Sequence, residues 1–168
     1  TVAFIVNLKK QEFKAGDKVI DDFDGTAGDN TLGGKWTVFN DKAEGGASYA
    51  NPTSFTAAAY ATGETGKGVS LRLVGSAGAP NPYVGVRTTF NAAGTPVSLG
   101  PAKSVIFDIH GDEGGKIRVE LEQPDGQAGD YFGQTITLTS GTFQRLRLPF
   151  SAFKRPEGSA LTTPLSLA

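Results

Sequence analysis

The chain has 168 residues, enough for one domain with a substantial core, and a net charge of -1 that offers no general attraction to nucleic acid or to an anionic membrane. It contains no cysteine, which excludes disulfides, thiol catalysis and cysteine-ligated zinc and leaves the compartment undecided. No apolar run approaches the roughly 20 residues that a membrane-spanning helix needs.

The first part of the chain contains short apolar segments between polar loops. Apolar residues alternate along segment 1–8, which predicts a strand carrying Val2, Phe4, Val6 and Leu8. Residues 18–23 predict a short strand that opens into the acidic turn Asp24-Gly25, and residues 34–40 carry the only tryptophan. Region 43–68, rich in Gly, Ala, Ser and Thr, predicts one or two edge strands with long loops.

A clean two-residue period follows in six segments: 69–74, 83–90, 104–110, 116–122, 131–138 and 143–148. We expect the apolar face of these strands to be buried, in particular Val84, Val86, Phe107, Ile109, Val119 and Leu148. We expect the other face to point to solvent, including Tyr83, Arg87, Asp108 and His110. One-sided alternation with Gly, Asp and Pro turns predicts an all-β, antiparallel β-sandwich with almost no helix.

The sequence argues against an enzyme. His110 is the only histidine, no Gly-x-Ser-x-Gly elbow is present, and no pair of carboxylates is singled out by spacing. The outward arginines alternate with acidic residues on neighbouring strands, so cross-strand pairing explains them better than nucleic-acid binding does. These arginines are Arg72, Arg87, Arg118, Arg145 and Arg147.

Two groups of residues suggest binding. The stretch 21–25 places several carboxylates beside a glycine, which suits either a hard cation such as calcium or a solvated turn. Tyrosine and tryptophan rings stack on sugars, and Arg and Asp complete the hydrogen bonds. Candidates for that role are Tyr83, Arg87, Trp36, Asp130 and Tyr131, although Trp36 also suits a core position.

From about residue 18 the sequence resembles the family-11 carbohydrate-binding modules, galactose-binding-like β-jelly-rolls. The motifs that carry the resemblance are Val-Ile-Asp-Asp-Phe-Asp-Gly (19–25), Thr-Gly-Lys-Gly-Val (65–69), Val-Ile-Phe-Asp-Ile (105–109) and Leu-Arg-Leu-Pro-Phe-Ser-Ala-Phe-Lys-Arg (146–155). The resemblance implies that a single β-1,4 or mixed-linked glucan chain binds in the concave cleft of one sheet, with a structural calcium ion.

Carried over by position, the resemblance places Tyr83 on a cleft tyrosine, Trp36 near another cleft aromatic, and Asp130 in the acidic loop before a strand. Arg155 follows the Pro-Phe-Ser-x-Phe motif, where the family keeps a sugar-contacting arginine. For calcium it implies Asp22 and Asp24, with a carbonyl near Lys67 as a further partner.

We therefore expect residues 1–17 to form an N-terminal strand or extension and residues 18–168 to form the module, without the family's last two strands. We expect segment 1–8 to pair into the sheet near that gap, or a second chain or a further C-terminal segment to fill it. The expected function is a secreted, non-catalytic polysaccharide-binding module within a larger carbohydrate-active enzyme, with no nucleic-acid or membrane partner. The alternatives are an assembly or adhesion domain, or an accessory fragment of an enzyme whose catalytic residues lie elsewhere.

Overall fold

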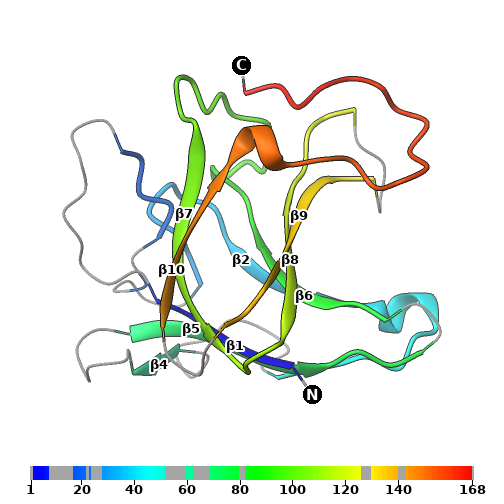
Figure 1. Cartoon of the computed structure of the whole chain (residues 1–168). Helices are drawn as coiled ribbons and strands as arrows, with labels where there is room; N and C mark the ends of the chain where they lie inside the picture. The colour runs from blue at the N-terminus through cyan, green and yellow to red at the C-terminus, as the bar shows by residue number, and fades with distance from the viewer. Residues whose placement is uncertain are drawn as a thin grey trace.

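A computed structural model describes residues 2–7, 17–21, 23, 28–51, 60–62, 69–79, 82–125, 130–139 and 143–167 (Figure 1). Within these residues the regular secondary structure is almost entirely strand. The strands are β1 (Val2–Asn7), β2 (Trp36–Asn40), β3 (Tyr49–Asn51), β4 (Tyr60–Thr62), β5 (Val69–Ser76), β6 (Val84–Thr88), β7 (Ser104–Gly111), β8 (Lys116–Leu121), β9 (Phe132–Thr137) and β10 (Gln144–Pro149). Two short 3-10 helices, η1 (Asp41–Glu44) and η3 (Phe150–Ala152), complete the described elements. Neither of these helical turns has the length and apolar character of a membrane-spanning helix.

The largest sheet has six strands in the order β10-β7-β1-β5-β3, and β4 also pairs with β5. Every pair in it is antiparallel. The N-terminal strand β1 lies in the middle, with Phe4 opposite Leu73 on one side and opposite Gly111 on the other. The expectation that the first residues pair into a sheet is confirmed, and their place is central rather than at an edge.

Two smaller antiparallel sheets complete the described strands. One pairs β2 with β6, with Val38 opposite Val86, and the other pairs β8 with β9, with Leu121 opposite Phe132. The all-β prediction is therefore confirmed, and the described residues between 43 and 68 include the short strands β3 and β4, as expected.

The core lies where β7 and β10 face β8 and β9 (Figure 1). Its buried centre consists of Phe132, Leu148, Phe150 and Phe153, and half-buried Val105, Phe107, Val119, Leu121 and Ile136 pack around them. Of the six residues predicted to face inward, Ile109 and Leu148 are buried and the other four are half-buried. The prediction that all six would be buried is therefore correct for Ile109 and Leu148 only, although exposed and half-buried residues alternate along β8 as expected.

The C-terminal segment after η3 closes one end of this core (Figure 1). Lys154 and Gly133 exchange backbone hydrogen bonds of 3.0 and 2.8 Å along the edge of β9 that does not pair with β8. Further on, the carbonyl of Leu167 accepts hydrogen bonds from the backbones of Leu99 and Gly100, and Leu165 and Leu167 pack against the core.

The strand predicted at residues 18–23 does not form in its described residues, 18–21 and 23. The reason is local. Oδ1 of Asp21 accepts the backbone N–H of Phe23 at 2.7 Å, and Phe23 takes a φ of 57°, outside the extended region. A side chain that bonds the backbone two residues later competes with strand pairing.

Asp108 was expected to face solvent and does not. It is 6% exposed, because Arg145 on the adjacent strand binds both carboxylate oxygens at 2.9 Å. His110 on the same face is half-buried, with its ring centroid 5.4 Å from that of Phe143. The strand parity is as predicted, but neighbouring side chains cover this part of the face.

Candidate functional site

The six predicted sugar-contacting residues occupy three separate places. Trp36 begins β2, and its indole N–H donates to Oδ2 of Asp21 at 2.5 Å. The Trp36 ring centroid lies 5.6 Å from that of the buried Phe23. Because Thr37 pairs with Arg87, the neighbouring Trp36 points to the opposite face of the β2–β6 sheet. The structure therefore does not bring Trp36 together with Arg87.

Tyr83 and Arg87 share the outward face of β2–β6. The ring of Tyr83 lies 6.1 Å, centroid to centroid, from that of Phe39. Phe39 is paired with Gly85, where a Cβ atom would lie only 2.6 Å from Cζ of Phe39. Glycine at position 85 therefore lets the Phe39 ring lie close to the strand backbone, beside Tyr83.

The helical turn η1 holds Tyr83 in place. A hydrogen bond to Glu44 raises the pKa of the Tyr83 hydroxyl, and burial and the negative charges of Glu44 and Asp41 raise it further. The Asp41 carboxylate, 1% exposed, accepts the Ser48 hydroxyl at 2.6 Å and the Ser48 backbone N–H at 2.9 Å. Burial raises the pKa of Asp41, but hydrogen bonds from Ser48 and from the Tyr83 backbone outweigh it and lower the pKa below 3.8. An ionised Asp41 thus fixes η1 and Tyr83 to each other.

The charge of Arg87 on β6 acts on the hydroxyl group of Tyr131 beside β9. Tyr131 precedes β9 and points outward, because the next residue, Phe132, belongs to the core. Burial raises the pKa of Tyr131, as do the charges of Glu122 and Glu120, whereas the positive charge of Arg87 lowers it. The outward faces of β2–β6 and β8–β9 therefore lie within electrostatic range of each other.

We call the outward side chains of these two sheets the small-sheet surface. Arg87 is exposed on it, and its Nε donates to Oγ1 of Thr37 at 3.3 Å. The small-sheet surface includes Thr37, Phe39, Tyr83, Arg87, Arg118, Glu120 and Tyr131.

Sequence reasoning did not select Arg118 as a binding residue, because its charge was attributed to cross-strand pairing. In the structure its Nε donates to Oε1 of Glu120 at 2.7 Å, on the same strand. Its Nη2 donates to the backbone carbonyl of Tyr131 at 3.3 Å. The available signal was Gly133, a glycine at an outward position inside a predicted strand, which often marks a close approach.

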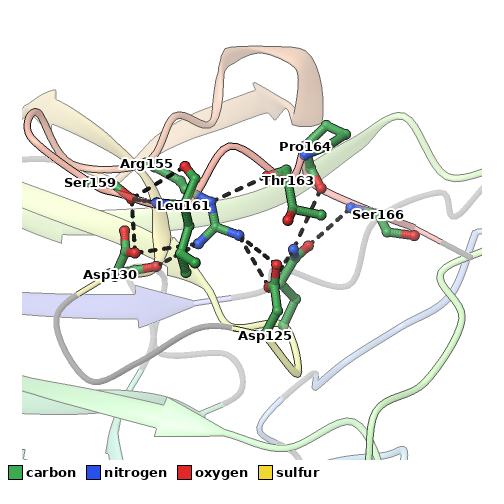
Figure 2. Close-up of polar contacts among 9 residues, drawn as sticks. Asp125, Asp130, Arg155, Ser159, Leu161, Thr163, Pro164 and Ser166 are labelled. Carbon is green, nitrogen blue, oxygen red and sulfur yellow. Dashed lines mark hydrogen bonds and ion pairs between the residues drawn. The ribbon is translucent and has the colours of Figure 1, made fainter.

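The side chain of Arg155 is buried in a hydrogen-bond network that joins the C-terminal segment to the β8–β9 loop (Figure 2). Its side chain is 8% exposed. Nε donates to the carbonyl of Thr163 at 3.2 Å, and Nη1 to the carbonyl of Asp130 at 3.0 Å. Nη2 bonds both carboxylate oxygens of Asp125, at 3.0 and 3.1 Å. All three guanidinium nitrogens are therefore engaged with protein acceptors.

Asp130 and Asp125 receive further bonds from their neighbours (Figure 2). The Ser159 hydroxyl donates to Oδ2 of Asp130 at 2.8 Å, and that oxygen lies 3.8 Å from Nη1 of Arg155. A hydrogen bond from Gln123 lowers the pKa of Asp125, against the effect of burial, and bonds from Arg155 and Thr163 lower it further. The structure thus brings Asp130 and Arg155 together as an anchor for the backbone that leads into Tyr131.

The residues predicted to bind calcium, Asp22, Asp24 and Lys67, lie outside the described residues. The described neighbour Asp21 directs its carboxylate to the Phe23 backbone and the Trp36 indole. Calcium binding therefore stays a prediction from the sequence.

Comparisons with protein-family models, with curated proteins and with solved structures found no match for this chain.

Proposed function

We propose that the chain is a non-catalytic carbohydrate-binding module of the jelly-roll sandwich type, and that it binds a β-1,4 or mixed-linked glucan on the small-sheet surface. The observation that carries the proposal is that the positive charge of Arg87 on β6 lowers the pKa of Tyr131, the residue before β9, so the two side chains lie within electrostatic range although they are far apart in the sequence. A tyrosine ring supplies a stacking face for a sugar, and an arginine supplies hydrogen-bond donors for its hydroxyl groups.

The rest of the surface supports this proposal. Tyr83 adds a second aromatic ring. Its hydroxyl group is hydrogen-bonded to Glu44, and its ring lies beside that of Phe39. A ring fixed before binding loses little conformational entropy when it stacks on a ligand. The nearby charges are of both signs, with Arg87 and Arg118 beside Glu120 and Glu122, which favours an uncharged polysaccharide over an acidic one.

The wider proposal follows the family resemblance. The module would be secreted, attached to a catalytic domain in the same parent protein, and stabilised by a calcium ion at Asp22 and Asp24. Affinity electrophoresis against mixed-linked β-glucan, xyloglucan, mannan and xylan tests the ligand class directly. Retardation by β-glucan supports the proposal, and unretarded migration in all four gels would overturn it.

One observation favours the alternative of a protein-assembly domain. Tyr49 is 48% exposed on β3, the last strand in the order of the largest sheet. An edge strand presents unpaired backbone groups that another chain can pair with. Light scattering across a concentration series tests this alternative, because edge pairing predicts a dimer that Tyr49→Lys dissociates.

A further inference from the structure

Arg118 is held flat against the backbone of the neighbouring strand. A Cβ atom placed on Gly133 would lie 2.4 Å from both Cζ and Nη2 of Arg118, and 2.6 Å from Nε. Three atoms of one plane at nearly equal distances mean that the face of the guanidinium group covers the α-carbon of Gly133. Any side chain at position 133 would therefore push Arg118 off the strand.

The bonds of Arg118 fix its orientation and leave donors available. Nε is bound to Glu120, and Nη2 is bound to the carbonyl of Tyr131. A guanidinium group has five N–H donors. Among the described residues no acceptor is bonded to Nη1, and the side chain is 38% exposed. Arg118 therefore offers oriented donors to an acceptor from outside the chain.

We propose that Arg118 is a ligand-binding residue, whose available N–H groups donate to hydroxyl or ring oxygens of a neutral polysaccharide lying against Tyr131. This inference rests on the proposed function and adds a binding residue to it. The bonds to Glu120 and Tyr131 fix the side chain before the ligand arrives, so binding costs little further rotamer entropy. Glu120 also balances the positive charge, which suits an uncharged sugar chain.

A purely structural role explains this arrangement less well. Arg118 and Glu120 are two residues apart on one strand, and both side chains are 38% exposed. An exposed ion pair of this kind contributes little to stability. Glycine at position 133 contributes no side-chain packing to the strand. Its effect here is to let the guanidinium group of Arg118 lie against the strand backbone.

Titration calorimetry with soluble mixed-linked β-glucan tests the inference on the whole chain. The variants are Arg118→Ala, Gly133→Ala and the double substitution. Arg147→Ala is the matched control, because Arg147 is an exposed arginine on β10 of the largest sheet, bonded to Ser104 at 3.1 Å. Each variant is also melted thermally, and polygalacturonate serves as a carboxylated probe.

We expect Arg118→Ala to weaken glucan binding about tenfold or more, as a well-placed interface residue does, with an unchanged melting temperature. Gly133→Ala should weaken binding through displacement of Arg118, so it should add nothing in the Arg118→Ala background. Arg147→Ala should bind normally.

Three results would overturn the inference: wild-type affinity in Arg118→Ala, a fall in melting temperature that accounts for the lost affinity, or tighter binding of polygalacturonate than of glucan. If the unmodified chain binds no glucan, the proposed function itself fails. Glucan binding that survives Arg118→Ala removes this inference alone.

Discussion

The guanidinium carbon of Arg155 lies 4.4 Å from the centroid of the Phe132 ring, so a cation of the C-terminal segment packs on an aromatic ring of the core. The same guanidinium group bonds the loop that enters β9. One side chain therefore joins the core, the β8–β9 loop and the C-terminal segment.

Arg155→Ala should consequently lower the free energy of unfolding by about 2–3 kcal/mol, because carbonyl and carboxylate acceptors would lose a charged donor. Arg155→Lys should restore only part of this, since an ammonium group cannot reproduce the planar fork. Urea unfolding measures both. The exposed Arg147→Ala should stay within about 0.5 kcal/mol of the original chain. Equal stability of the Arg155 and Arg147 variants would show that the network around Arg155 contributes nothing.

Most strand positions, and part of the buried faces, could be predicted from the sequence because both depend on alternation along one strand. Ile109 and Leu148 illustrate this, since their inward parity is visible without any knowledge of neighbouring strands. The middle position of β1 could not be predicted, because it depends on pairing with two strands that are distant in sequence.

The candidate site was less predictable for the same reason. Tyr83 and Arg87 lie on one face, as their parity predicts, but the association of Arg155 with Asp125 and Asp130 depends on the folded path of the C-terminal segment. Trp36 was assigned by residue type and by the family resemblance, and neither of these predicts its hydrogen bond to Asp21, a contact without local sequence signal.

Asp41 should make stability pH-dependent. Its folded pKa is lowered below 3.8, so its contribution to stability is present above about pH 3.8 and is lost as the pH falls through the lower folded value. Asp41→Asn cannot titrate, and its amide group cannot accept both bonds from Ser48. Urea melts from pH 7 down to about pH 2.5 should show the stability difference between the original chain and this variant shrinking on acidification. Parallel curves would contradict the assignment.

Two substitutions of Tyr83 distinguish the contribution of its ring to binding from that of its hydroxyl group. Tyr83→Ala should weaken glucan binding by about 1–3 kcal/mol, a loss typical of a stacked aromatic at an interface centre. Tyr83→Phe removes only the hydrogen bond to Glu44 and should keep most of the affinity. Calorimetry of the two variants distinguishes them, and full affinity in Tyr83→Ala would remove this residue from the binding surface.

Calcium should raise the melting temperature if it binds at Asp22 and Asp24, because a ligand of the folded state alone stabilises that state. We expect excess chelator to lower the melting temperature of the original chain and to leave that of Asp22→Asn/Asp24→Asn unchanged. Circular dichroism before and after chelation serves as the control that the fold persists. A melting curve indifferent to both calcium and chelator would reject the site.

Trp36 is the only tryptophan of the chain, which makes its environment directly measurable. Because it faces away from Arg87 and binds Asp21, glucan should leave its fluorescence emission unchanged. Trp36→Phe should keep the affinity for glucan but lower the free energy of unfolding by about 1.5–3 kcal/mol, since Asp21 is buried and loses a donor. A shift of the emission on glucan addition, together with weakened binding in Trp36→Phe, would instead place Trp36 in contact with the ligand, as the family resemblance implies.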